Sequence, residues 1–342
     1  MAEEQRAILV GCGTISKVWL DAVQEIPNLH VVGLVDIEEE AAHARAQEHG
    51  LTDVLVSTDL ESAIERSSPH MVFDCTVPEA HKEVTLTALR RGCHVLGEKP
   101  MAESMEDARR MVAAAQEAGK LYAVIQNRRY DANIRTLCNL LQSGAVGAIT
   151  TVNSDFYIGA HFAGFRDRME HVLLLDMAIH TFDAARLISG ADPVSVYCKE
   201  WNPAGSWYDH DASAVAIFEM TDGIVYTYRG SWCSEGLHTT WESEWRVMGQ
   251  SGSAKWDGAA GIRAQAVAES GGFFSTFSDV AAPPYQGCQK VGGHAGVIRE
   301  FVACVETGAV PETICTDNIK SLAMVFAAVE SAQTGQPVQV DI

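Results

Sequence analysis

The sequence is poor in positive charge. Of its 342 residues, 25 are Lys or Arg and 45 are Asp or Glu, which gives a net charge of −20. Proteins that bind DNA, RNA or anionic membranes need clustered Lys and Arg side chains, so we expect no nucleic acid partner. Long apolar runs are also missing, because no stretch reaches the ~18 apolar residues of a transmembrane helix. We therefore expect no membrane partner.

Paired cysteines are missing too. The nine cysteines are scattered, with an odd total and no Cys-x-x-Cys pair. This pattern argues against a disulfide framework and favours reduced thiols in a reducing compartment, so we expect a cytoplasmic protein and predict no metal site. The acidic start, Met1 to Arg6, carries no apolar signal core, which agrees with that expectation. Cys12 is a candidate for oxidation, although a small residue filling a loop is the simpler interpretation.

The first third of the chain alternates short apolar strands with helices. The strand 7–10 runs into Gly11-Cys12-Gly13-Thr14-Ile15-Ser16, and the apolar spacing after this loop is typical of a helix. In a dinucleotide-binding turn, the first glycine allows the bend and the second lets the backbone approach the pyrophosphate. The amides of Thr14 and Ile15, at the start of the helix, then meet the negative charge. The third glycine of this fingerprint is Ser16 here, which weakens the match.

The second strand ends in an acidic residue, Asp36, 23 positions after Gly13. This spacing predicts that the Asp36 carboxylate accepts hydrogen bonds from the adenosine ribose, and the same carboxylate would repel the 2′-phosphate of NADP. The following Ile37-Glu38-Glu39-Glu40 offers no arginine for that phosphate. We predict NAD as the cofactor, with NADP as the alternative.

More strand and helix units follow, and one of these strands, 94–97, ends in Glu98-Lys99-Pro100. Ligands of open parallel sheets bind beyond the carboxyl ends of the strands, so we predict that Lys99 points into the cofactor crevice, with Glu98 beside it. A surface lysine is the alternative. Thr76 and His81 follow the preceding strand at the same edge. His81 either approaches the nicotinamide or lies on the surface of a helix.

Beyond Gln126 the pattern changes to longer segments of alternating polarity, around 148–158, 194–201, 212–220, 224–233 and 243–249. Thr221-Asp222-Gly223 and the turn at 249–252 are hairpin signals, which predict a mostly antiparallel sheet. The residues from Glu269 to Gly293 are typical of a long loop. We therefore expect a dinucleotide-binding domain at 1–126 and a substrate-binding and oligomerisation domain at 127–342.

Six of the seven tryptophans lie between Trp201 and Trp256. Their rings could stack on a sugar, but no loop signal places them near the cofactor. We favour a sheet face that is buried against another subunit, which predicts a homodimer or homotetramer built through this sheet.

A helix is predicted over 170–190 by its apolar spacing and by the glycine at position 190. Asp176 and His180 lie four positions apart, so both side chains project from one helix face, within about 6 Å of each other. A carboxylate at that distance can orient an imidazole or share its proton, while an ion pair on the helix surface is the alternative. Because their neighbours are apolar, we expect both groups to be buried.

The order and spacing of several motifs resembles the Gfo/Idh/MocA oxidoreductases, a family that includes inositol 2-dehydrogenase and glucose-fructose oxidoreductase. These motifs are Gly11-x-Gly13 with Asp36, Glu98-Lys99-Pro100, Arg128-Arg129-Tyr130-Asp131, Ser143-Gly144-x-x-Gly147 and Asp176-x-x-x-His180. The resemblance implies an α/β fold class, with a Rossmann doubly wound sheet followed by an α/β domain whose large sheet is open. It also implies oxidation or reduction at a ring carbon of a sugar, inositol or related polyol.

The resemblance assigns roles to individual positions. The positions that correspond to catalytic and substrate-binding residues are Lys99, Asp176 and His180. The positions where members meet the cofactor are Gly11, Gly13, Asp36, His81 and Glu98.

Two departures from the family pattern bear on the substrate. Glu170-His171 stands where many members have a glycine pair, and Pro78-Glu79 replaces a Pro-Asn pair. The first change puts an imidazole near the expected substrate pocket. We therefore add His171, Arg166 and His161 to the candidate substrate contacts, with solvated loop residues as the alternative.

The predicted chemistry follows from what alcohol oxidation requires, namely a base near neutral pH and a donor for the reacting oxygen. His180 fits the base, Asp176 holds and polarises it, and Lys99 donates to the oxygen, although Lys99 and His180 could exchange roles. Two other functions remain open. One is a non-catalytic NAD-binding regulator, and the other is a glycosidase that oxidises its sugar transiently and retains NAD.

Overall fold

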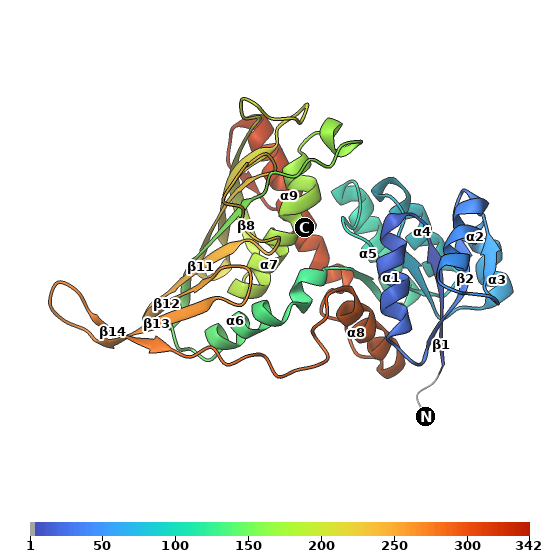
Figure 1. Cartoon of the computed structure of the whole chain (residues 1–342), viewed down its shortest axis with the longest axis horizontal. Helices are drawn as coiled ribbons and strands as arrows, with labels where there is room; N and C mark the ends of the chain where they lie inside the picture. The colour runs from blue at the N-terminus through green and yellow to red at the C-terminus, as the bar shows by residue number, and fades with distance from the viewer. Residues whose placement is uncertain (1–3) are drawn as a thin grey trace. The chain divides into compact units, whose positions relative to one another are not determined.

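The computed structural model describes residues 4–342, and these form two compact units. The first unit contains the chain up to Tyr130 together with Cys288–Ile319, and the second contains Asp131–Gly287 with Lys320–Ile342. Figure 1 shows the course of the chain through both units by colour. Within residues 4–342, every helix is too short or too polar to cross a lipid bilayer.

The first unit is built on a six-stranded parallel sheet with the order β3-β2-β1-β4-β5-β6. Its strands are β1 (Gln5–Val10), β2 (Leu29–Val35), β3 (Leu55–Ser57), β4 (Met71–Asp74), β5 (His94–Gly97) and β6 (Tyr122–Val124). The strand order reverses between β1 and β4, and such a reversal opens a crevice at the carboxyl ends of the strands. The prediction of a Rossmann doubly wound sheet is confirmed.

Helices cover both faces of this sheet. They are α1 (Thr14–Gln24), α2 (Glu39–Glu48), α3 (Leu60–Ser67), α4 (Pro78–Arg90), α5 (Met105–Ala118) and α8 (His294–Thr307). Helices α1, α2 and α8 share one apolar core with the inward side chains of the strands, while α3, α4 and α5 pack on one another at the other face. Local sequence sets their ends: Ser104 accepts a hydrogen bond from the Asp107 amide before α5, and Gly119 ends that helix in the left-handed conformation.

Helix α8 belongs to the first unit although it comes late in the chain. Its buried side chains Val297, Ile298 and Phe301 lie in the same core as Trp19 of α1, and Figure 1 shows the two helices side by side. A single boundary after residue 126 assigns this helix to the second domain, whereas its contacts assign it to the first. The reason is its apolar face, which fills the part of the sheet left open by α1 and α2.

The second unit is built on a nine-stranded sheet with the order β14-β13-β12-β11-β7-β10-β9-β8-β15. Its strands are β7 (Ile149–Tyr157), β8 (Pro193–Trp201), β9 (Ser213–Met220), β10 (Val225–Ser231), β11 (Glu244–Gly249), β12 (Gly252–Trp256), β13 (Ile262–Glu269), β14 (Thr276–Val280) and β15 (Val338–Gln339). All neighbouring strands are antiparallel except β7 and β10, so the predicted mostly antiparallel sheet is confirmed.

Both hairpin signals of this sheet are correct. The turn at 221–223 joins β9 to β10, and the turn after Gly249 joins β11 to β12. The prediction of a long loop over 269–293 is wrong in part, because Thr276–Val280 forms the edge strand β14 against β13. The alternation of Phe277 with polar neighbours was too short to outweigh the surrounding glycines and prolines. Figure 1 shows this hairpin projecting from the edge of the sheet.

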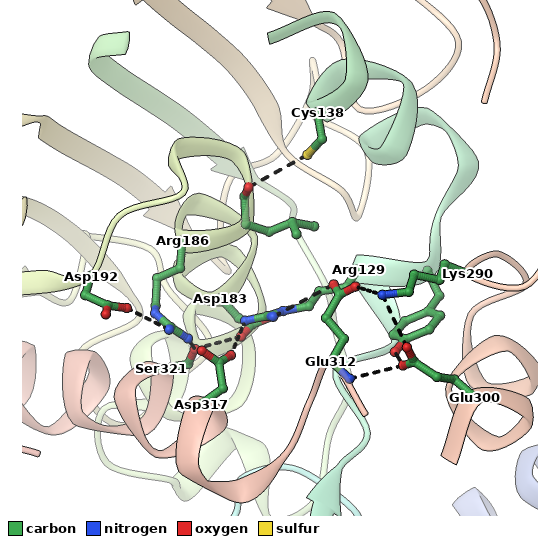
Figure 2. Close-up of polar contacts among 12 residues, drawn as sticks. Arg129, Cys138, Asp183, Arg186, Asp192, Lys290, Glu300, Glu312, Asp317 and Ser321 are labelled. Carbon is green, nitrogen blue, oxygen red and sulfur yellow. Dashed lines mark hydrogen bonds and ion pairs between the residues drawn. The ribbon is translucent and has the colours of Figure 1, made fainter. Parts of the chain in front are cut away.

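Helices cover one face of the nine-stranded sheet. They are α6 (Ala132–Gln142), the π-helical turn η3 (Leu173–Ala178), α7 (Ile179–Ser189) and the part of α9 (Cys315–Thr334) that belongs to this unit. A buried polar network fixes α7, because Ser321 of α9 donates to Asp183 at 2.7 Å and receives a hydrogen bond from Arg186 at 3.0 Å (Figure 2). Asp192, just after α7, accepts from Arg186 at 2.8 Å. Buried groups that satisfy one another in this way hold a helix in one orientation.

The tryptophans do not form the outward face that we expected. Trp232, Trp245 and Trp256 are 1%, 3% and 2% exposed, so their own unit buries them. Trp245 and Trp256 are cross-strand partners in β11 and β12, so they share one face of the sheet. Trp232 follows β10 directly, and Trp201 at the end of β8 is 41% exposed. The expectation that the tryptophan-rich face packs against another subunit is therefore wrong for the three buried rings.

Candidate active site

The glycine loop after β1 has the geometry of a phosphate-binding turn. Gly11 has a φ of +87°, and a Cβ built on it would lie 2.7 Å from the Cys75 carbonyl, so only glycine fits there. Gly13 differs, because a Cβ on it would meet no atom within 4 Å. The backbone at Gly13 therefore faces open space at the end of β1.

Helix α1 begins at Thr14 directly after this loop, and no side chain caps its first amides. The backbone N–H groups of Thr14 and Ile15 thus lie in the first turn of a helix, where the helix dipole favours an anion. Ser16, at the third fingerprint position, is fully buried, and its hydroxyl donates to the Gly13 carbonyl at 2.6 Å. At the position of the third glycine, the serine thus adds a hydrogen bond that stabilises the loop.

Asp36 lies beside the glycine loop at the end of β2. Its carboxylate accepts hydrogen bonds from the Cys12 amide at 2.6 Å and from the Glu38 amide at 2.9 Å. A residue that the sequence argument missed, Arg45 of α2, donates from its guanidinium to the Gly13 carbonyl at 3.0 Å and pairs with Glu48. Arg45 lies five positions beyond Glu40, and helix α2 brings its side chain back to the glycine loop.

Cys12 is an inert residue of the loop. Its side chain is 5% exposed, and burial, with a smaller contribution from Asp36, raises the pKa of its thiol to about 12. A thiol in this state is not the reactive thiolate form, so the interpretation of Cys12 as a small filler has the better support.

The turn after β4 holds a group of three polar side chains, of which Asp74 and His81 are buried. Asp74 accepts from the Thr76 hydroxyl at 2.6 Å and lies 3.0 Å from Nδ1 of His81. His81 is only 2% exposed, so the interpretation of it as a helix-surface residue is wrong. Burial opposes the charged imidazole, but the Asp74 carboxylate outweighs it and raises the pKa of His81. Asp74 thus holds the residue that we predicted near the cofactor.

Lys99 follows β5 and is partly buried, and its peptide bond to Pro100 is cis. The carboxylate beside it, that of Glu98, accepts from Trp19 Nε1 at 2.7 Å and lies 3.6 Å from His294 Nε2. Burial favours the neutral acid, but the nearby His294 imidazole and the hydrogen bond from Trp19 outweigh it and lower the pKa of Glu98. An ionised carboxylate therefore lies next to Lys99 at the carboxyl edge of the sheet.

His294 was missed by the sequence argument. It is the first residue of α8 and follows Gly292 and Gly293, whose φ values are both positive. It lies 195 positions after Lys99, and no spacing pattern links the two. Only the return of the chain to the first unit brings its imidazole to Glu98.

In the second unit, Asp176 lies in a π-helical turn and not in a regular α-helix. A π-turn makes i→i+5 hydrogen bonds, so the four-residue spacing to His180 no longer sets the geometry that we predicted. The Asp176 carboxylate accepts two hydrogen bonds from the Arg166 guanidinium, at 2.8 and 3.3 Å. Arg166, which we predicted as a substrate contact, thus holds the predicted catalytic carboxylate in a forked ion pair.

His180 lies in the first turn of α7 and is 8% exposed, while the side chain of Asp176 is 14% exposed. The expectation of burial is therefore confirmed for His180, whereas Asp176 is only partly buried. Such π-turns inside helices are frequent at functional sites.

His171 has both ring nitrogens engaged. Nδ1 lies 2.5 Å from the Glu200 carboxylate, and Nε2 lies 3.0 Å from the Gln333 amide. The hydrogen bond with Glu200 raises the pKa of His171, and burial raises the pKa of Glu200. With a φ of +52°, His171 keeps a left-handed backbone that glycine adopts at less cost. Its ring thus ties the loop before η3 to β8 and α9.

His161 lies in the loop after β7. Its ring stacks on Trp207 with 3.8 Å between centroids, and its Nε2 lies 2.9 Å from Glu235. Across residues 4–342, His, Cys, Asp and Glu side chains form no group of three or more that could hold a metal ion.

Comparison with known protein families gives two adjacent matches. Residues 5–126 match the "Oxidoreductase family, NAD-binding Rossmann fold" of the Gfo/Idh/MocA group, and residues 134–255 match a "GFO/IDH/MocA C-terminal domain". The first unit is thus an NAD-binding Rossmann domain, in agreement with the geometry of its glycine loop.

Two curated relatives are similar over nearly the whole chain. A 1,5-anhydro-D-fructose reductase of Ensifer adhaerens is 25% identical over 97% of this chain and 98% of its own length. A D-apiose dehydrogenase of Paraburkholderia graminis is 26% identical over 98% of this chain and 89% of its own length.

Among solved structures, an oxidoreductase from Agrobacterium radiobacter in complex with NAD⁺, L-tartaric acid and magnesium has the same fold. The two chains share 20% of their residues with a TM-score of 0.86 over 98% of each.

Proposed function

Because this chain belongs to the Gfo/Idh/MocA family of NAD-binding sugar oxidoreductases, we propose that it is an NAD-dependent dehydrogenase of a neutral sugar, inositol or related polyol. The reaction transfers a hydride between a ring carbon that bears a hydroxyl and the nicotinamide. The two curated relatives named above act on sugars, which supports this substrate class.

One observation carries the proposal. Lys99 follows β5 at the carboxyl edge of the NAD-binding sheet, beside a Glu98 carboxylate that Trp19 and His294 hold in place. A lysine there has a defined position and a fixed negative neighbour, which suits a donor to a reacting oxygen. A solvated surface lysine needs neither.

The roles of the residues follow from the chemistry of alcohol oxidation. NAD accepts the hydride, which is the hard part of the reaction. Lys99 donates a hydrogen bond to the substrate oxygen, and His180 accepts the hydroxyl proton, with the two roles exchangeable. Asp176, fixed by Arg166, orients the base. The Thr76, Asp74 and His81 group keeps the turn after β4 in shape at the same edge as Lys99.

NAD is preferred over NADP in this proposal. The Asp36 carboxylate lies at the glycine loop, and a 2′-phosphate placed there would be repelled. Arg45 would be the cation for such a phosphate, but its guanidinium is engaged by Glu48 and by the Gly13 carbonyl. Asp36 therefore dominates the choice.

We also propose a homodimer or homotetramer formed through the outer face of the nine-stranded sheet. Exposed apolar side chains alternate with buried ones along three adjacent strands of this sheet, namely Val194, Tyr197 and Trp201 of β8, Ile217 of β9 and Val225 of β10. An apolar sheet face of this kind is typical of a subunit interface.

A spectrophotometric screen of inositols, aldoses and glycosides with NAD and NADP tests the activity. We expect NADH to form with at least one of them, and the variant Lys99→Ala to lower kcat by about 10²–10⁴-fold, the range for loss of acid–base help. The affinity for NAD should change by less than about twofold, because Lys99 acts on the substrate oxygen.

Lys17→Ala is the matched control, since Lys17 lies on the same unit and its side chain is 55% exposed. It should leave kcat unchanged. Full turnover by Lys99→Ala would remove this lysine from the mechanism. If NAD copurifies and glycosides are cleaved without net NADH, the enzyme is a glycosidase instead.

A further inference from the structure

The loops around Asp176 carry an unusual number of exposed aromatic rings. Phe162, Phe165 and Trp241 are 39%, 63% and 48% exposed, and we call these three residues the aromatic rim. Soluble proteins bury most large aromatic side chains, so a cluster left open to solvent indicates a binding surface.

The rim is connected to Asp176 by direct contacts. The guanidinium of Arg166, which holds Asp176 at 2.8 Å, lies 4.9 Å from the centre of the Phe162 ring and 4.8 Å from that of Phe165. Phe162 lies 6.4 Å from Trp241 between ring centres. The side chains of Asp176 and Arg166 are 14% and 32% exposed, and all three rim residues are more exposed still. The contacts thus lead from the partly buried carboxylate outward to solvent.

The buried ring of Trp232 supports the aromatic rim and keeps it rigid. Trp232 is 1% exposed and lies 5.1 Å from Phe162 and 5.6 Å from Trp241 between ring centres, with Phe156 on its other side at 5.0 Å. Edge-to-face contacts of this kind fix the orientation of the rings. Ring faces that are fixed before binding lose little entropy when a ligand stacks on them.

The charges of the surrounding loops select against an anionic ligand. The three loops 158–170, 201–211 and 232–243 contain six acidic residues and two basic ones. One of the two basic residues, Arg166, is neutralised by Asp176. A sugar phosphate or a nucleotide sugar would therefore be repelled, whereas a neutral sugar would not.

We propose that the aromatic rim binds the second ring of a neutral glycoside, while the ring to be oxidised lies at Asp176. The C–H groups on the face of a pyranose carry partial positive charge and pack on the negative face of an aromatic ring. This inference rests on the proposed function, because it takes Asp176 as the residue at the reacting ring. It narrows the substrate from any sugar or polyol to a disaccharide or similar glycoside.

Binding and turnover of matched sugars test this inference. The probes are glucose and galactose with the disaccharides cellobiose, maltose and lactose, each titrated into NAD-saturated enzyme by calorimetry and assayed for NADH. We expect at least one disaccharide to bind more tightly than its free monosaccharide. The variants Trp241→Ala and Phe162→Ala should weaken that disaccharide by about tenfold, the effect of losing one aromatic contact, and the monosaccharide by less than about twofold.

Phe277→Ala is the matched control, because Phe277 is 56% exposed on β14 and makes no contact with the rim. It should change neither affinity. Equal losses for both sugars, no loss for either, or no disaccharide that binds better than its monosaccharide would overturn the inference. A rim variant that changes the mass in sedimentation would show that the rim is a subunit interface, which also overturns it. If disaccharides bind through the rim but no hydride reaches NAD, the proposed function fails and the rim assignment stands.

Discussion

In the first unit, the residues predicted to meet NAD follow directly after the ends of four neighbouring strands, and much of their chemistry is that of the backbone. Gly11 and Gly13 supply space, Thr14 and Ile15 supply amides, and the side chain of Asp36 is itself fixed by two amides. In the second unit, Asp176 depends on the side chain of Arg166, and the rim above it is drawn from two separate loops. The cofactor region is thus set by strand ends, and the substrate region by side-chain contacts.

This difference bears on how each region tolerates change. A site made of backbone is disturbed by small additions of volume, whereas a site made of side chains is disturbed by loss of a partner. It also agrees with the roles that we propose for the two regions, in which one holds the cofactor and the other contacts the substrate. Three variants test the comparison.

The largest effect is expected where the first unit does depend on side chains, at the buried Asp74 and His81. Asp74→Asn removes the charge that holds the imidazolium and should lower the free energy of unfolding by about 3 kcal/mol at pH 6, the cost of breaking a buried ion pair. The folded state raises the pKa of His81, so the stability from this pair is complete below the ordinary histidine pKa and is lost as pH rises through the raised value. Urea unfolding of the wild type and of Asp74→Asn at pH 6 and pH 9 measures the difference between their free energies of unfolding, which should be smaller at pH 9.

The control for this variant is Glu79→Gln, which removes an exposed carboxylate near the same histidine. It should change stability by less than about 0.5 kcal/mol. If the difference in free energy of unfolding between the wild type and Asp74→Asn grows with pH, the ion pair between Asp74 and His81 is contradicted.

The second prediction tests whether the backbone of the glycine loop forms the cofactor region. Gly13 has a φ of −70° and open space at its Cβ position, so Gly13→Ala should fold with unchanged stability. Its methyl group would occupy the approach to the pyrophosphate and should weaken NAD binding by about 10–100-fold, in line with the ~1–3 kcal/mol cost of overpacking. Calorimetric titration with NAD and a thermal melt measure the two properties.

Gly50→Ala is the comparison for backbone strain alone, since Gly50 has a φ of +65° and open space around it. It should lower stability and leave NAD affinity unchanged. If Gly13→Ala binds NAD normally, the loop does not approach the cofactor as we infer.

The smallest effect concerns the ion pair of the second unit. Arg166→Lys keeps the charge but loses the fork that holds both oxygens of Asp176. We expect kcat to fall by about tenfold, or ~1.4 kcal/mol, with KM nearly unchanged, because the change misplaces a catalytic group. Steady-state kinetics measures both constants. Arg168→Lys, in the same turn but exposed, should behave as wild type, and equal effects of the two variants would argue against a special role for Arg166.

Much of the fold could be predicted because strand periodicity and glycine turns are local signals. The parallel sheet, the mostly antiparallel sheet and the two hairpins follow from segments of a few residues each. The edge strand β14 was missed because glycines and prolines around it mask a short alternation. The assignment of α8 to the first unit was missed because no local pattern says which sheet an amphipathic helix covers.

The site divides in the same way. The glycine loop, Asp36 and the position of Lys99 follow from spacing, and their catalytic and binding roles stay predictions. The π-helical turn at Asp176 has no sequence signal, because the residues from Val172 to Ile179 are apolar apart from Asp176 and hide a one-residue shift in the apolar spacing. The pairing of Arg166 with Asp176 and the contact of His294 with Glu98 were missed because only the folded chain brings these residues together.

The position of helix α8 affects whether the NAD-binding domain can be transferred between proteins as one continuous segment. A fragment that ended at residue 126 would leave Trp19 and its neighbours without Phe301 and Ile298 and would lack the histidine beside Glu98. Residues 1–126 are therefore not a complete NAD-binding domain on their own. A transfer of the first unit to another protein would have to include both the segment up to Tyr130 and the segment Cys288–Ile319.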